Sequence, residues 1–181
     1  SKLTYFPILE EDFESGLPSG WIIENGGATA YYPGTNIPAT WTDQNPGHRV
    51  PQGGCRGRFM IVDNDYAGWI AMEEGLVTKD ISCVGQSKVI LEFDHAWLGG
   101  LATEKGLVQV CWWNSQDMSW ENTTIATFTA HDIDIGHKTY DITSLAAGKT
   151  IRIKWYYNNY RDYGFWWMVD NVRIGGEPAY D

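Results

Sequence analysis

The sequence is poor in cysteine, in basic residues and in long apolar segments. Its 181 residues include three cysteines, Cys55, Cys83 and Cys111, and because none lies in a C-x-x-C pair we expect no zinc site built from cysteines. Thirteen basic residues against 23 acidic ones give a net charge of -10, which argues against nucleic-acid partners and anionic membrane surfaces. No apolar run approaches the length of a transmembrane helix, so we expect no membrane insertion.

The common catalytic motifs are missing as well. The sequence contains no HExxH, no GxSxG and no glycine-rich phosphate loop. A glycosidase needs two carboxylates that face each other, and no motif supports such a pair for Asp94 with Glu92 or Glu73. The four histidines are scattered without the spacing of metal ligands. We therefore expect a binding protein and not an enzyme.

Helical periodicity never persists beyond one turn, and alternation takes its place. After residue 80, apolar and polar side chains alternate in KVILEFDHAW (88–97), GLVQVCWW (106–113) and IRIKWYY (151–157). This period of two is typical of half-buried strands, and turn-forming clusters separate the segments. The pattern predicts an all-β protein, a two-sheet antiparallel jelly-roll sandwich that forms a single module over residues 1–181.

Aromatic residues are abundant, with ten tryptophans and ten tyrosines, and alternation divides them between two faces. Trp155 shares the side of Ile151 and Ile153, which predicts a core position, whereas Tyr156 points the other way. An outward ring can stack on the apolar face of a sugar while amides and guanidinium groups bond its hydroxyls. The candidate ligand-binding residues are Trp97, Trp113, Tyr156, Trp166, Gln109, Arg152 and Asn158. The alternative is that Trp113 and Trp166 pack beneath the long loops of the first half.

Three segments match a known pattern in the same order along the chain. They are EEDFESGLPSGW (10–21), GLVTKDISCVGQSKVILEFDHAW (75–97) and GFWWMVDNVRI (164–174). Together they resemble the opening, middle and closing strands of jelly-roll domains of the MAM and cleaved-adhesin type, a resemblance that spans roughly residues 10–175. Lys79 departs from the pattern, since the family usually has proline there.

The resemblance implies an extracellular, non-catalytic module attached to a larger precursor. We therefore expect a secreted or cell-surface location, with other domains of that precursor as partners. Carbohydrate-binding modules share this jelly roll, and they often pair an N-terminal Phe-Glu with a C-terminal Asp-Asn around a structural calcium ion. In this chain the two pairs are Phe13-Glu14 and Asp170-Asn171.

Carboxylates at the two ends of the chain are the first candidate calcium ligands. Asp12 and Glu14 would project to the same side of a strand, and the first strand of a jelly roll commonly lies near the last one, which carries Asp170. The three would repel one another without a cation among them. The alternative is a surface Asp12 and an Asp170 that only fixes a turn. Asp63 and Asp65 in VDNDYAG are a second candidate site, or else part of an Asx-rich turn.

These observations favour a carbohydrate-binding module that recognises a neutral polysaccharide or other glycan through exposed aromatic rings and contains structural calcium. A protein-interaction or adhesion module without sugar binding is the second reading, and a structural spacer the third. A cluster of exposed rings would favour the first, and a broad, flat apolar patch the second.

Overall fold

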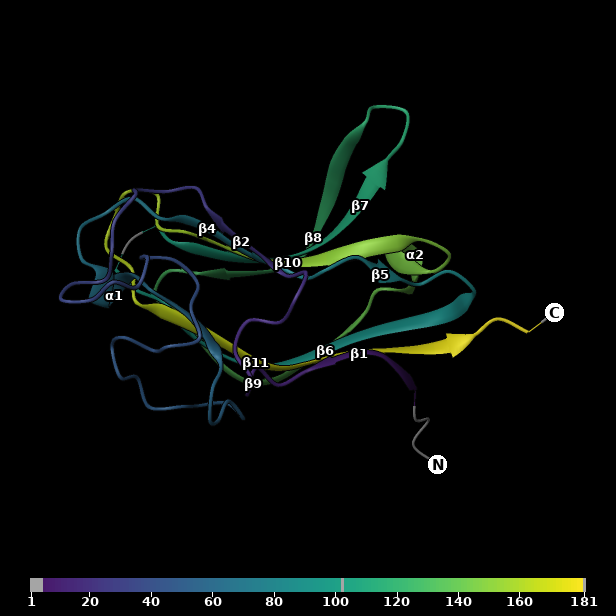
Figure 1. The fold of residues 1–181 in the computed structure, drawn as a ribbon, viewed down its shortest axis with the longest axis horizontal. Coiled ribbons are helices and arrows are strands. Elements are labelled where there is room, and N and C mark those ends of the chain that lie inside the picture. Colours follow the sequence, from purple (N-terminus) through teal and green to yellow (C-terminus); the bar gives the residue numbers. More distant parts are fainter. Residues whose placement is uncertain (1–4, 102, 181) are drawn as a thin grey trace.

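Two antiparallel sheets lie face to face in the computed structural model, which describes residues 5–101 and 103–180 (Figure 1). One sheet has the order β1-β11-β6-β9, with β3 beside β11, and the other has the order β2-β4-β10-β7-β8, with β5 beside β10. The predicted two-sheet jelly-roll sandwich is confirmed.

The bounds of the elements are as follows. The five-stranded sheet contains β1 (Phe6–Glu11), β3 (Met60–Asp63), β6 (Gln86–Leu98), β9 (Ile133–Asp141) and β11 (Trp166–Pro178). The six-stranded sheet contains β2 (Ile22–Asn25), β4 (Glu73–Val77), β5 (Ile81–Ser82), β7 (Lys105–Asn114), β8 (Ser119–Thr129) and β10 (Thr150–Asn158). Two single-turn helices, α1 (Asn64–Ala67) and α2 (Thr143–Ala146), interrupt the strands.

The core lies between the sheets and is built from the inward half of each alternating segment. Trp155 and Tyr157 of β10 face Trp97 of β6 and Trp167 of β11, and none of the four side chains is accessible to solvent. Full burial of one large apolar side chain stabilises the fold by about 1.5–3 kcal/mol. The aromatic richness of β10 and β11 is thus explained first by packing.

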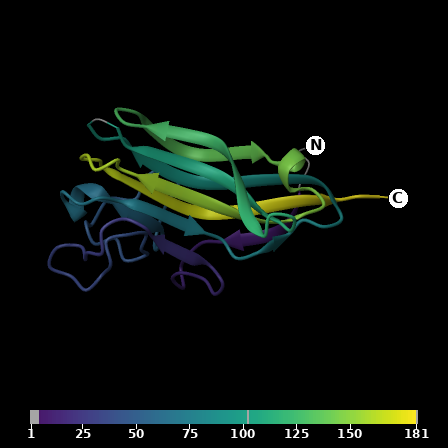
Figure 2. The same ribbon diagram turned by 90° about the horizontal axis from the view of Figure 1, so that it is seen from above.

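A long loop between β2 and β3 covers part of the outer face of the five-stranded sheet. Cys55 and Phe59 of this loop pack on Ala96 and Met168, which point outward from β6 and β11. At Gly53 the backbone comes so close to the sheet that an added Cβ would lie 2.2 Å from the carbonyl oxygen of His95, and its φ of 68° also favours glycine. Figure 2 shows the loop segments gathered along one side of the molecule. On the outer side of the six-stranded sheet, Arg152, Lys154 and Tyr156 of β10 are partly exposed, whereas Gln109 and Cys111 of β7 are buried.

The hairpin of β7 and β8 extends beyond the sandwich as an arm. In Figure 1 it rises away from the plane of β10 and ends in the turn between residues 114 and 119. Cross-strand register shifts where Val108 pairs with Ala126 but Gln109 pairs with Thr124, which leaves Ile125 as an extra residue. Such a bulge bends a strand and increases its twist. Because β7 stays paired with β10 as far as Trp112, the bulge bends β8 before the hairpin leaves the sandwich.

The described residues contain no helix that is both long and apolar enough to span a membrane.

Candidate functional site

The outer side of the six-stranded sheet carries most of the predicted ligand-binding residues. Arg152 and Tyr156, both partly exposed, alternate along β10 with the buried residues of the core, and Asn158 has the same orientation but is only 8% exposed. Gln109 and Trp113 point the same way from β7, since Gln109 pairs with Lys154 in the register of the two strands. We call this surface, over β10, β7 and β8, the outer face.

A pair of tryptophans stands at the arm end of the outer face. Trp113 of β7 and Trp120 of β8 are cross-strand partners, and their ring centroids are 5.8 Å apart in an edge-to-face arrangement. Trp113 is 44% exposed and Trp120 is 37% exposed, so both rings are open to a ligand. The guanidinium of Arg152 lies 3.9 Å from the Trp120 ring centroid and bonds the carboxylate of Asp80 at 2.6 Å, which holds it in place.

Amide and hydroxyl groups occupy the middle of the outer face. The Gln109 amide donates to the Thr124 hydroxyl at 3.1 Å, and the Asn158 amide donates to the Tyr156 hydroxyl at 3.4 Å. Lys154 lies between the two pairs and forms an ion pair with Glu24 at 2.6 Å. Rings and neutral hydrogen-bonding groups therefore alternate along one surface, each held by a neighbour.

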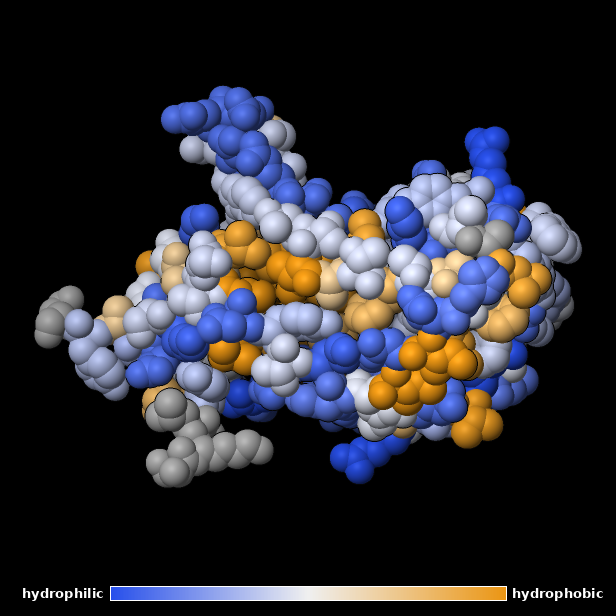
Figure 3. Space-filling model, turned by 180° about the vertical axis from the view of Figure 1, so that it is seen from behind, coloured by the Kyte–Doolittle hydropathy of each residue, from blue (hydrophilic) through white to orange (hydrophobic). Residues whose placement is uncertain are grey.

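The arm makes this surface concave. In Figure 3 the outline of the molecule dips between the projecting arm and the loops at the other end of the sandwich. A recess of about 480 Å³ lies beside the arm, lined by residues 112–116 of β7 and its turn together with Lys149 and Thr150. Along β7, the nine residues from Lys105 to Trp113 span about 26 Å at the usual rise per residue. An extended chain molecule can lie along the outer face over this length.

Two predicted ligand residues do not belong to the outer face. Trp97 is fully buried, and its indole donates a hydrogen bond to the carbonyl of Thr129 at 2.9 Å, so the prediction that it binds a ligand was wrong. Trp166 points outward from β11, but β11 belongs to the five-stranded sheet, where the loop cluster around Cys55 and Phe59 packs against it. Trp166 therefore packs beneath a loop of the first half of the chain, as the alternative prediction had it.

Arg49 contacts both the Trp166 ring and the two carboxylates of the VDNDYAG segment. Its guanidinium lies 3.8 Å from the Trp166 ring centroid and forms two bonds to the carboxylate of Asp63, at 2.7 and 3.1 Å. It also bonds Asp65 at 2.7 Å, while Asp63 caps α1 by accepting from the amide of Tyr66. The Arg49 guanidinium thus lies between Asp63 and Asp65, where a calcium ion was the first expectation. The alternative, an Asx-rich turn, accounts for this segment without a metal ion.

The carboxylates predicted at the chain ends are only partly brought together. The first strand pairs with the last, as expected, but β1 ends at Glu11 and Phe13 has a φ of 56°, so Asp12 and Glu14 do not share the face of a strand. Asp12 is exposed and accepts from the amide of Glu14, which leaves it in a turn. Glu14 instead approaches the loop, where it accepts from the amide of Arg58 at 3.1 Å.

Asp170 is the buried member of this set. Its side chain is inaccessible to solvent and accepts hydrogen bonds from the amides of Arg56 and Asn171. Burial and the negative charges of Glu14 and Asp94 raise the pKa of Asp170 to about 6, against the two hydrogen bonds, which lower it. Carboxylates and backbone oxygens are the ligands that calcium prefers, so the donor chemistry around Glu14 and Asp170 fits a cation. However, no three acidic, histidine or cysteine side chains converge on one point in the described parts of the chain.

Sequence reasoning left Trp120 out of the candidate residues. It follows the turn Asn114–Ser119 directly, and a residue so close to a turn has no clear face until the cross-strand partner is known. The short connection between Trp113 and Trp120 is the signal that could have paired them, because a hairpin places residues at equal distances from its turn opposite each other.

Comparison with solved structures identifies proteins with the same fold. The chain superposes on the K3 cleaved adhesin domain of Lys-gingipain from Porphyromonas gingivalis W83 with a TM-score of 0.62 and 18% identity, covering 94% of this chain and 98% of that one. The C-terminal family 22 carbohydrate-binding module of Clostridium thermocellum Xyn10B gives a TM-score of 0.52 and 9% identity over 97% and 96% of the two chains. The CBM22-1 xylan-binding domain of Paenibacillus barcinonensis Xyn10C gives 0.50 and 13% over 99% and 100%.

The resemblance to cleaved-adhesin and carbohydrate-binding jelly rolls is thereby confirmed for the fold. No family model matches the sequence, and no curated protein sequence matches it. All three identities are too low to transfer a binding site residue by residue. The function is therefore inferred from the side chains of the outer face.

Proposed function

We propose that the protein is a non-catalytic carbohydrate-binding module that holds a neutral glycan chain along the outer face of its six-stranded sheet. The observation that carries this proposal is the exposed Trp113–Trp120 pair, beside ordered amide and hydroxyl groups on one concave face. A sugar chain presents apolar C–H faces for the rings and hydroxyls for the amides, and both kinds of group occur here in alternation.

The side chains of the outer face have distinct roles in this proposal. Trp113, Trp120 and Tyr156 provide stacking surfaces, and Arg152 hydrogen-bonds hydroxyl groups. Gln109 and Asn158 are only 9% and 8% exposed, so they mainly hold neighbouring side chains in place. Their mutual contacts fix them before a ligand arrives, which lowers the entropy cost of binding. Since the proposed contacts are to neutral groups, binding in the middle of the outer face depends little on salt.

The solved structures support the proposal by their names. Two of the three similar structures are family 22 carbohydrate-binding modules, and one of these is named a xylan-binding domain. The third is a cleaved adhesin domain, which keeps an adhesion module as the second candidate. An adhesion module would present a broad apolar patch to a protein partner, whereas the outer face alternates rings with polar groups. We therefore favour glycan binding, with a secreted or cell-surface location.

We also propose that a calcium ion binds where Glu14 and Asp170 approach the loop at Arg56 and Arg58. The buried carboxylate of Asp170 forms no ion pair with a lysine or arginine side chain within residues 5–101 and 103–180, although Glu14 and Asp94 add negative charge nearby. Asp12, Asp63 and Asp65 take no part in this proposal. A bound cation would fix the loop on the five-stranded sheet and leave the outer face of the other sheet free.

Affinity electrophoresis against a panel of neutral polysaccharides, beginning with xylan, tests the glycan proposal. The wild-type protein should be retarded by at least one of them, Tyr156→Ala should migrate freely, and Tyr156→Phe should be retarded nearly as the wild type, because the ring alone provides the stacking surface. Free migration of the wild type in every gel, or equal retardation of Tyr156→Ala, would contradict the proposal.

A further inference from the structure

Two positively charged side chains stand at the end of the outer face that lies opposite the arm. Lys105 begins β7 and pairs with Asn158 across the strands, and Arg161 follows three residues after Asn158. Seven of the protein's lysines and arginines form ion pairs, and neither Lys105 nor Arg161 is among them in the described chain. Arg56, Lys79 and Lys149 likewise form no ion pair within the described chain, so the distinguishing feature of Lys105 and Arg161 is that each lines a recess beside the exposed ring of Tyr160.

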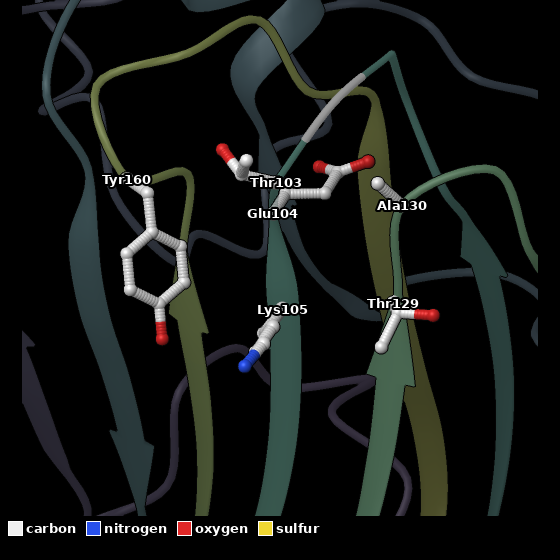
Figure 4. Close-up of a pocket in the computed structure, with 6 residues that line it drawn as sticks. All are labelled: Thr103, Glu104, Lys105, Thr129, Ala130 and Tyr160. Carbon is white, nitrogen blue, oxygen red and sulfur yellow. The ribbon is translucent and has the colours of Figure 1, made fainter.

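Lys105 opens into a recess of about 590 Å³ (Figure 4). The figure shows the Tyr160 ring on one side of the recess, the Lys105 ammonium low in the middle and the Thr129 side chain on the other side. The ammonium lies 5.8 Å from the centroid of the Tyr160 ring. A smaller recess of about 210 Å³ lies beyond Tyr160 and is lined by Arg161 together with Asn158 and Glu73.

The carboxylate nearest to Lys105 in sequence is already engaged in the interior. Glu104 is only 1% exposed, and its side chain accepts from the Tyr157 hydroxyl at 2.5 Å, from the amide of Phe165 at 3.2 Å and from the amide of Gly100. Its acceptor sites therefore serve to fix the surrounding loops. Two carboxylates remain near the recesses: Glu73, which is exposed and lines the smaller one, and Asp132, which accepts from the Thr129 hydroxyl at 2.5 Å.

The backbone between the two recesses is held in an uncommon conformation. Tyr160 and Arg161 have φ values of 51° and 60°, and each such residue costs about 1–3 kcal/mol unless its surroundings fix it. The side chains of Asn158 and Asn159 supply that support, since they accept from the amides of Tyr160 and Arg161 at 2.7 and 3.1 Å. The turn presents the Tyr160 ring, 49% exposed, between the two cations.

We infer that this end of the outer face is a subsite for an acidic sugar, in which a uronate ring stacks on Tyr160 and its carboxylate pairs with Lys105. Arg161 adds positive potential from the far side of the ring, and the Thr103 side chain lines the same recess as Lys105. The Thr129 hydroxyl already donates to the carboxylate of Asp132 at 2.5 Å, so only its oxygen can accept from a sugar hydroxyl. The inference rests on the proposed glycan function and narrows it: the glycan has a neutral main chain and carries uronate groups.

Titration of the intact protein with D-glucuronate, followed by amide chemical shifts, tests the subsite without any polysaccharide. Glucuronate should shift the amide signals of Lys105, Tyr160 and Arg161, whereas D-glucose at the same concentration should not. Lys105→Gln should weaken the apparent affinity about tenfold, as expected for the loss of one charge-assisted bond, and salt should weaken it in the wild type. Lys79→Gln is the matched control. Lys79 is an exposed lysine that follows the C-terminal end of β4, whereas Glu73, beside the subsite, begins that strand.

Two outcomes would overturn the inference. Equal shifts with glucose would show that the carboxylate is not recognised, and equal shifts with acetate would reduce the subsite to general anion binding. An unchanged affinity in Lys105→Gln with a normal melting temperature would likewise contradict it. The glycan proposal fails separately, through polysaccharide electrophoresis, because Tyr156→Ala leaves the glucuronate contacts at Tyr160 in place.

Discussion

Replacement of Arg49 by methionine should destabilise the protein strongly although the residue lies in a loop. The substitution keeps an apolar side chain against Trp166 but removes the two bonds to Asp63 and the bond to Asp65. The side chain of Asp63 is fully buried, so it would be left as a buried charge without a cationic partner. Loss of one partner of a buried ion pair costs about 3–5 kcal/mol.

The lower end of that range applies here, for two structural reasons. Asp63 keeps the hydrogen bond from the amide of Tyr66, and the Arg49 side chain is 20% exposed, so water screens part of the interaction. A loss of about 3 kcal/mol corresponds to a fall in melting temperature of about 6–12 °C for a protein of this size. Thermal unfolding followed by circular dichroism measures it directly.

Two further variants separate charge from geometry. Arg49→Lys keeps the charge but cannot form the bidentate contact with Asp63, so we expect a smaller loss of stability than in Arg49→Met. The double variant Arg49→Met/Asp63→Asn should recover part of the loss, because asparagine still caps α1 and leaves no buried charge. A melting temperature of Arg49→Met equal to that of the wild type would refute the account of this cluster.

The remaining predictions concern calcium and pH. If Glu14 and Asp170 hold calcium, excess EDTA should lower the melting temperature and added calcium should restore it; a hundredfold excess over the dissociation constant corresponds to about 2.7 kcal/mol. Asp170→Asn should abolish this response, and an unchanged response in that variant would place the ion elsewhere. For His137, partial burial lowers the pKa, but hydrogen bonds to Glu92 and Asp94 outweigh it, so that the pKa lies above its usual value. The stability contributed by His137 should therefore be complete below about pH 6.5 and be lost as pH rises through the raised pKa, and His137→Gln should show no such loss in pH-dependent melting curves.

The sandwich could be predicted because alternation is a local property that survives in the final structure. β10 shows this most clearly, since Ile151, Ile153 and Trp155 are all fully buried as expected. The same rule corrects the prediction for Trp97: β6 continues to Leu98, so the alternation that begins at Val89 turns Trp97 inward.

Other features of the site depend on contacts that no local pattern contains. Trp166 and Tyr156 both point outward, but alternation cannot tell that β11 and β10 belong to different sheets. Asp63 lies fourteen residues from Arg49, and nothing in the spacing of VDNDYAG indicates that a guanidinium balances its charge. The bulge at Ile125 likewise becomes apparent only once the register of β7 and β8 is known.

The measurement that tests the central claim most directly compares two exposed tryptophans. Trp113→Ala removes a ring from the outer face. Trp69→Ala, the matched control, removes a ring that is 79% exposed and lies tilted against Tyr163, with the ring centroids 5.0 Å apart. Both variants should melt within about 1 kcal/mol of the wild type, since neither ring is part of the core. Calorimetric titration with the polysaccharide that binds the wild type should show at least a tenfold weaker affinity for Trp113→Ala and an unchanged affinity for Trp69→Ala. Unchanged affinity in Trp113→Ala, or a loss confined to Trp69→Ala, would contradict glycan binding along the outer face.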